Sequence, residues 1–348
     1  MLQLNRHIVN SFRSKYTCIL FTMSVFFSAL SYGQGPQFTQ FYASPLYLAP
    51  SFTGATDGSR AALNYRNQWP ELPGAFVTYA FSLDHYFHKY KSGLGLLILR
   101  DEAGSARLGN TTAGLLYSYN FEVGHNWTMR PGINFNYTQQ TIDYQSLIFG
   151  DQLSIDGNHS STSLITMPLL DRAAYFDASF SWLAYTGNLW LGLSADHLMM
   201  PNQSLTGQVD RIPIKYGFFG GYKFLLSGAL AQMEEESISL AFMYRNQGPF
   251  NQFDLGVYWY HYPFSLGLLY RGIPLFNNPV YGVANNDAVA LIGGIRTKAL
   301  RIGYSYDFTI SRLMTSTGGA HEISIIYHFN QGAPQRRPGK IPCPVSQQ

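Results

Sequence analysis

Charged side chains are scarce in this sequence of 348 residues. They make up 12% of the chain, about half of the roughly 25% that is usual for soluble globular proteins. Aromatic residues, in contrast, reach 16%. The formal net charge of +3 is too small to favour nucleic-acid binding, which normally leaves a strongly basic surface. The composition therefore disfavours both a soluble globular protein and a partner made of nucleic acid.

Long apolar runs are also nearly absent. Mean hydropathy is -0.07, which excludes a bundle of membrane helices, because each such helix needs about 20 mostly apolar residues in a row. The single long run follows Arg6, Arg13 and Lys15 and is followed by the small residues of SYGQG. This layout is typical of a secretory signal peptide covering residues 1–33. A retained anchor helix is the alternative, which the shortness of the run disfavours. We therefore predict an exported protein.

Cysteine and recognisable catalytic groupings are missing as well. The chain has two cysteines, and Cys18 lies in the predicted signal peptide, so Cys343 would remain alone and no internal disulfide could form. No Ser/His/Asp grouping is evident. His321 and Glu322 are neighbours in a predicted strand and point to opposite faces, which disfavours a shared metal ion. We therefore predict no enzyme activity, no catalytic residue, no metal site and no cofactor.

The chain is rich in segments that alternate apolar and polar residues, from Ser59 to Phe329. In the stretch LRIGYSYDFTIS, Ile302 and Tyr304 fall on one face of an extended chain, while Arg301 and Asp307 fall on the other. A strand of a soluble sandwich would look the same. About fourteen such segments occur, however, and many have the roughly 9 to 12 residues that a tilted strand needs to cross a bilayer. Together with the composition, they favour strands placed between lipid and water.

The joints between these segments alternate in length. Short joints occur at Thr186 and Tyr262, whereas long ones run from Thr141 to Ala173 and from Met199 to Ile212. Outer-membrane barrels have short turns on the periplasmic side and longer loops outside. We therefore predict an all-β fold, a transmembrane antiparallel β-barrel of about 14 strands in the outer membrane. The expected parts are a signal peptide (1–33), a periplasmic N-terminal segment (34–58), the barrel (59–329) and a periplasmic C-terminal tail (330–348).

Two groups of residues are candidates for function. The first group would lie in the lumen or bind a partner, and it consists of Arg66, Trp69, Arg245, Arg271, Arg296, Arg301 and Asp307. The alternative for its charged members is that they form ion pairs that brace the lumen. The second would dock onto something in the periplasm: Phe38, Phe41, Tyr42, Tyr47 and Phe52 in the N-terminal segment, and Arg336, Arg337 and Lys340 in the tail. A disordered end is the alternative for the tail.

The motifs resemble those of the PorP/SprF family of outer-membrane proteins, which take part in type IX secretion and gliding motility in Bacteroidota. The resemblance begins at PQFTQFYASPLYLAPSFTGA and continues through YRNQWPEL, GYKF, LRIGYSYDFTIS, GAHEISIIYHF and KIPCP. It implies a non-enzymatic barrel that anchors or helps to deliver a secreted adhesin with a C-terminal sorting domain. It also implies periplasmic or secretion-machinery proteins as partners, besides outer-membrane lipid. A channel or transporter for small or hydrophobic solutes is the alternative function.

Overall fold

The structure is a computed structural model of the whole chain. It describes residues 35–56, 58–124, 126–147, 152, 170–227, 236–277, 284–297, 299–310, 317–330 and 341–342. The chain divides into two units, Met1–Gly35 and Pro36–Gln348. Only Gly35 of the first unit is described, so the predicted signal peptide lies outside the described residues.

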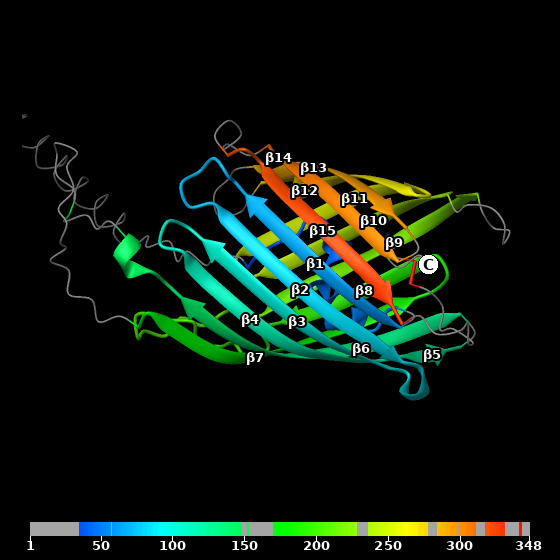
Figure 1. Cartoon of the computed structure of the whole chain (residues 1–348), viewed down its shortest axis with the longest axis horizontal. Coiled ribbons are helices and arrows are strands. Elements are labelled where there is room, and N and C mark those ends of the chain that lie inside the picture. Colours follow the sequence, from blue (N-terminus) through cyan, green and yellow to red (C-terminus); the bar gives the residue numbers. More distant parts are fainter. Residues whose placement is uncertain are drawn as a thin grey trace, which may run out of the picture. The chain divides into compact units, whose positions relative to one another are not determined.

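The second unit is an antiparallel barrel of consecutive strands (Figure 1). Its described strands are β1 (Ser59–Gln68), β2 (Phe76–Phe87), β3 (Ser92–Ala103), β4 (Leu108–Tyr119), β5 (Phe121–Val123), β6 (Trp127–Thr141), β7 (Arg172–Tyr185), β8 (Leu189–Asp196), β9 (Lys215–Ser227), β10 (Glu236–Gln247), β11 (Phe250–His261), β12 (Phe264–Asn277), β13 (Ala284–Arg296), β14 (Leu300–Thr309) and β15 (Ala320–Phe329). Strand β5 continues β4 along the same partner, β6. Counting β4 and β5 as one strand, the 15 described strands form a barrel of 14 strands. The sequence predicted about this number.

The barrel closes between its first and last strands. Ser59 lies opposite Phe329, and Gln68 lies opposite Ala320. Closure leaves no free sheet edge, so every strand has a partner on both sides for its backbone amides and carbonyls. The wall begins at Ser59 in β1 and ends at Phe329 in β15.

Alternation along each strand separates an apolar outside from a polar inside. In β14, Ile302, Tyr304 and Phe308 are 48%, 47% and 47% exposed, whereas Ser305 and Asp307 are buried. This is the arrangement that the sequence indicated for this stretch, and it matches barrels that stand in lipid with a polar lumen. Among the described residues, no helix is both long enough and apolar enough to span a membrane.

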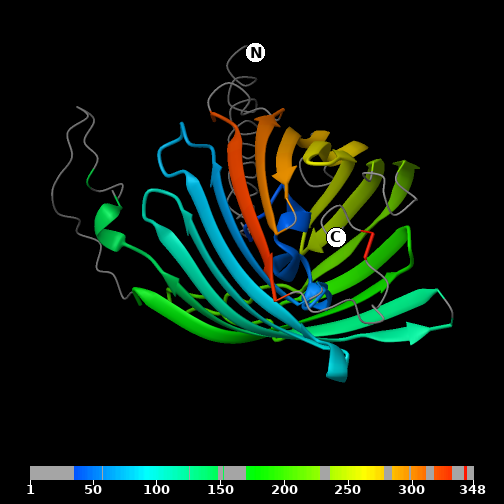
Figure 2. The same cartoon turned by 45° about the vertical axis from the view of Figure 1, so that its right-hand side comes forward.

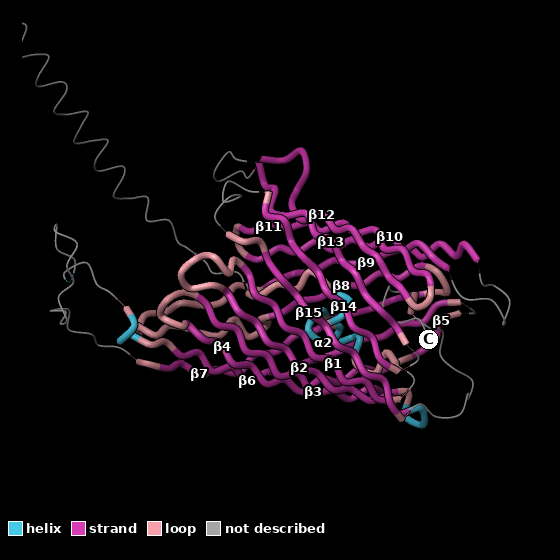
Figure 3. Tube along the Cα trace, turned by 45° about the horizontal axis from the view of Figure 1, so that its top comes forward, coloured by secondary structure: helices cyan, strands magenta, loops and turns pink. Residues whose placement is uncertain are grey.

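Residues 36–56, here called the lumenal segment, lie inside the barrel, where Figures 2 and 3 show short helical turns surrounded by strands. The turns are η1 (Phe41–Ala43), α2 (Pro45–Leu48) and η2 (Pro50–Phe52). Two further turns, η3 (His88–Tyr90) and η4 (Tyr144–Ser146), belong to joints between strands. Prolines begin α2 and η2, where the missing amide proton costs nothing.

The position of the lumenal segment corrects our expectation of a segment outside the barrel. Its aromatic residues suit docking, as the sequence indicated, but the surface that receives them is the inner face of the wall. Phe38, Phe41 and Phe52 are almost fully buried. Because the segment contains no charged residue between Pro36 and Ala55, it can enter the lumen without bringing a charge that needs a partner.

Candidate functional site

The lumenal segment crosses the barrel from one end to the other. We call the end with the long β6–β7 and β8–β9 joints the loop end, and the end with the short β7–β8 and β11–β12 joints the turn end. The amide of Thr39 donates to Glu322 near the start of β15. Thr56 hydrogen-bonds His328 near the end of the same strand. The chain therefore enters the lumen near the loop end and leaves it at the turn end, where β1 begins.

Thr39 lies at the centre of a charged cluster at the loop end. Its hydroxyl donates to Asp307 (2.6 Å) and accepts hydrogen bonds from Arg66 (2.7 Å) and Arg271 (3.0 Å). Its amide donates to the Glu322 carboxylate (2.7 Å). One small neutral residue thus contacts two cations and two anions of the wall.

Gln40 extends this contact along β14 and β15. Its amide donates to Glu322 (3.0 Å), and its side-chain nitrogen donates to the hydroxyl of Ser305 (3.4 Å). The hydroxyl of Ser324 donates to its side-chain oxygen (2.7 Å). Both the backbone amide and the side-chain amide of Gln40 are therefore hydrogen-bonded to the barrel wall.

The wall charges around Thr39 also pair with one another. Arg66 contacts Asp307 (2.8 Å) and Glu322 (3.2 Å), and Arg271 contacts Asp307 (3.2 Å). Asp254 joins Arg271 (3.5 Å) to Arg245 (2.5 Å). We call these three arginines and three carboxylates the loop-end network. Buried ion pairs of this kind are stable only when hydrogen bonds satisfy most of their remaining polar atoms.

A different set of contacts holds the lumenal segment at the turn end. Arg130 is 2% exposed and donates to the backbone oxygens of Ser51 (3.2 Å) and Thr53 (2.5 Å) and to the hydroxyl of Ser118 (3.0 Å). Its guanidinium group also lies over the ring of Tyr86. No carboxylate of the described residues forms an ion pair with it. The carbonyls of the segment therefore supply much of its polar surroundings.

A second turn-end contact involves an ion pair. Arg60 pairs with Asp84 (2.8 Å) and also donates to the backbone oxygen of Phe52 (3.1 Å). Asp84 in turn accepts a hydrogen bond from the amide of Gly54 (2.6 Å). Gly54 has a φ of +66°, a conformation that glycine adopts without strain.

An apolar cluster fills the turn-end half of the lumen. Phe52 packs against Trp190 and Phe219, with ring centroids 6.3 and 5.8 Å apart, and Phe41 packs against Tyr258. Ile341 of the C-terminal tail belongs to the same cluster and is 3% exposed. The lumenal segment and Ile341, which lie before and after the barrel strands in the sequence, therefore pack into one core.

The segment approaches the wall most closely at two glycines. A Cβ on Gly132 would lie 2.6 Å from the backbone oxygen of Pro50, and a Cβ on Gly93 would lie 2.6 Å from the carbonyl carbon of Thr53. Backbone thus packs directly on backbone at these points, because neither wall residue has a side chain.

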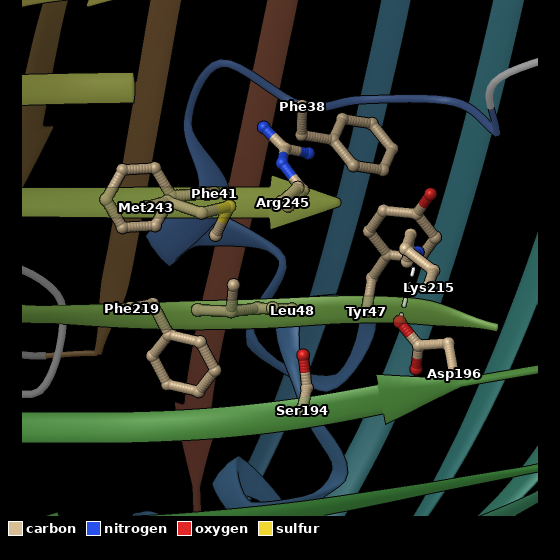
Figure 4. Close-up of a pocket in the computed structure, with 11 residues that line it drawn as sticks. Phe38, Phe41, Tyr47, Leu48, Ser194, Asp196, Lys215, Phe219, Met243 and Arg245 are labelled. Atoms are coloured by element: carbon tan, nitrogen blue, oxygen red, sulfur yellow. Dashed lines mark ion pairs between the residues drawn. The ribbon is translucent and has the colours of Figure 1, made fainter. Parts of the chain in front are cut away.

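A small cavity of about 30 Å³ lies between the segment and β8–β10 (Figure 4). Phe38, Tyr47 and Met243 line it together with the Lys215–Asp196 ion pair (3.0 Å). A space of this size holds only one or two water molecules. Burial raises the pKa of the Tyr47 hydroxyl, which donates to the backbone oxygen of Pro36.

The structure brings together part of the first predicted group. Arg66, Arg245, Arg271 and Asp307 are all in the loop-end network. The other three lie elsewhere. Trp69 packs on Phe76 beyond the end of β1 (centroids 5.5 Å apart), and Arg296 and Arg301 lie opposite each other at the turn end, with Arg296 over the ring of Tyr260.

In the second predicted group, all five aromatic residues belong to the lumenal segment. Tyr42 packs edge-on to Tyr258 (5.1 Å), and Tyr47 packs edge-on to Phe38 (5.3 Å). Arg336, Arg337 and Lys340 lie outside the described residues.

Sequence reasoning missed several residues of the site, namely Thr39, Arg60, Asp84, Arg130 and Glu322. The pairing of Glu322 with Arg66 could have been predicted from the strand register. Once Ser59 is placed opposite Phe329, an antiparallel register puts Arg66 opposite Glu322. In the described residues, no group of three or more His, Cys, Asp or Glu side chains is arranged to hold a metal ion.

A closed antiparallel barrel with an apolar outer face and a charged lumen defines the class of outer-membrane β-barrel proteins. Residues 30–327 match the family described as "Type IX secretion system membrane protein PorP/SprF". The chain belongs to this family and is a protein of the outer membrane. Membership implies partners in the secretion machinery.

Several solved structures share the barrel fold at low sequence identity. The Acinetobacter baumannii outer membrane protein Omp33 is 8% identical, with a TM-score of 0.42, and the match covers 78% of this chain and 99% of that one. The CymD monoaromatic hydrocarbon channel is 12% identical (TM-score 0.43; 85% and 95% covered). A Pseudomonas aeruginosa FadL homologue is 14% identical (TM-score 0.42; 82% and 94% covered). No curated protein matches the sequence.

Proposed function

We propose that this barrel is a non-enzymatic anchor of the type IX secretion system. It holds or helps to deliver a secreted surface protein, an adhesin with a C-terminal sorting domain, and it works with periplasmic components of the secretion machinery in gliding or secretion. In this arrangement the loop end faces the outside of the cell and the turn end faces the periplasm.

The observation that carries the proposal is the occupied lumen. Thr39 and Gln40 are bonded to the wall near the loop end, and Ser51, Thr53 and Gly54 are bonded to it at the turn end. Solute passage needs a pore lined by groups that bind weakly enough to release the solute. A segment that is bonded along its length supports a binding protein better than a channel. Membership of a secretion family and the absence of an evident catalytic grouping in the sequence both support a non-enzymatic role.

The alternative is an outer-membrane channel or transporter for small or hydrophobic solutes. The lumenal segment would then have to leave the lumen during transport. Arg130 argues against a complete exit, because it would lose its two carbonyl partners and has no ion-pair partner among the described residues.

Deletion of the gene separates the two functions. Surface biotinylation of the deletion strain should show the loss of one large secreted protein, while uptake of small dyes and antibiotics stays unchanged. Expression of the full-length chain in the same strain should restore the surface protein and serves as the control. An intact surface proteome with reduced solute uptake would refute the anchor and support the transporter.

A further inference from the structure

The ion pairs of the loop-end network do not depend on the lumenal segment. Its three arginines and three carboxylates all belong to wall strands and pair with one another. The segment contributes only neutral groups, which are the hydroxyl of Thr39, the amide of Gln40 and two backbone amides. Removing these groups would leave every one of these ion pairs in place, and water could take over the lost hydrogen bonds.

The turn end behaves differently. Without Ser51 and Thr53, Arg130 would keep the hydroxyl of Ser118 and the ring of Tyr86 but would have no carboxylate partner among the described residues. At the loop end, in contrast, each charge of the network keeps an ion-pair partner when the segment leaves. The part of the segment that can leave without separating a wall charge from its partners is therefore Phe38–Gln40, which we call the arm.

The wall forms a distinct binding position for each residue of the arm. Phe38 fits an apolar pocket formed by Ala80 and Leu99, next to the ring of Tyr47. Thr39 and Gln40 occupy the polar positions already described, on the loop-end network and on β14–β15. The order that this surface recognises is an aromatic, a hydroxyl and an amide side chain.

We propose that the loop end of the lumen is a peptide-binding site, filled in cis by the arm and open in trans to a neutral segment of the secreted partner with the same order of side chains. The identity of the partner as a secreted protein rests on the proposed function, whereas the site itself rests on the contacts above. A covalently attached arm competes at an effective concentration of about millimolar. A peptide in trans therefore binds well only when the arm has left the site.

The test uses the purified full-length barrel in detergent and a fluorescent peptide with the sequence GPQFTQ, residues 35–40. Phe38→Lys should expel the arm, because an ammonium group there would be buried beside Arg245 and Lys215, which line the same cavity. We expect the peptide to bind Phe38→Lys at least about tenfold more tightly than the wild type, as measured by fluorescence anisotropy. Phe38→Ala, which weakens the arm without adding a charge, should give an intermediate affinity.

Two controls define the site. Ala80→Trp in the Phe38→Lys barrel fills the pocket and should abolish peptide binding, and a peptide of the same composition in scrambled order should bind neither variant. Folding of each variant is checked by heat-modifiable migration on gels. The inference is overturned if folded Phe38→Lys and Phe38→Ala barrels bind the peptide no better than the wild type, or bind the scrambled peptide equally well.

This result is separable from the test of the proposed function. If peptide binding fails while gene deletion still removes the surface protein, the exchange site is wrong and the anchor stands. If the peptide binds while deletion leaves the surface proteome intact, the site is real and its partner is not a secreted surface protein.

Discussion

Replacing Gly132 with alanine should dislodge the lumenal segment at its turn end. The new Cβ would lie 2.6 Å from the backbone oxygen of Pro50 and closer still to Ser51 N. Ordinary contacts of a carbon atom are about 3.5 Å, so the segment must move by about 1 Å. That shift breaks the bond from Ser51 N to the hydroxyl of Ser181 (2.7 Å) and the bond from Arg130 to Ser51 O (3.2 Å).

The size of the effect follows from these two bonds. A neutral hydrogen bond contributes about 1 kcal/mol and one to a charged group about 1.5–3 kcal/mol, so the loss is roughly 2.5–4 kcal/mol. Since 1.4 kcal/mol corresponds to about a factor of ten, the released fraction should rise by about two to three orders of magnitude.

The assay is the labelling rate of a cysteine at Ala49, a buried residue next to Pro50, in a Cys343→Ser background. A small water-soluble thiol reagent reaches this position only when the segment opens, so the rate follows the released fraction. Gly293→Ala is the matched control, because a Cβ there meets nothing within 4 Å. Gly303→Ala, whose Cβ would have the flexible side chains of Gln40 and Ser324 as its nearest neighbours, should have a small effect. Equal labelling of folded Gly132→Ala and Gly293→Ala barrels would refute the packing argument.

Three further predictions concern the outer face, the tail and the topology. Ile325→Arg should impair assembly, measured by heat-modifiable migration, because a lipid-facing arginine costs about 2–4 kcal/mol; tolerance equal to that of Ile325→Ala would contradict the assigned face. Ile341→Asp should speed tryptic cleavage of the C-terminal tail, since an unpaired buried carboxylate costs several kcal/mol, and a rate no higher than that of Ile341→Val would contradict the packing. In a Cys343→Ser background, Val209→Cys, in the β8–β9 joint and 77% exposed, should react with an impermeant reagent on intact cells. Gly187→Cys, in the β7–β8 turn, should react only after lysis, and the opposite pattern would reverse the orientation.

The wall of the barrel was predictable from sequence because its signal is local. Each residue of β14 faces lipid or lumen according to its parity, so Ile302 and Asp307 could be assigned without knowing any neighbour. Strand length and composition then distinguished a membrane barrel from a soluble sheet. The family resemblance pointed to the same fold.

The contents of the lumen were not predictable in the same way. The lumenal segment has three prolines among its aromatic residues and no regular period, so its sequence showed that it docks but not onto which surface. Arg130 was missed because its partners are backbone oxygens, which every residue has. Glu322 was considered only together with its chain neighbour His321. Its partner is Arg66, which lies opposite it on β1, across the strand pair that closes the barrel.

The closing pair also couples closure of the barrel to occupation of its lumen. The arm is bound by β14 and β15, and the contact from Thr39 to Glu322 joins residues 283 positions apart in the chain. The surface that binds the arm is complete only when β1 pairs with β15. A chain that fails to close its seam therefore also lacks the site for its own N-terminal residues, so the wall and its contents form one unit of assembly.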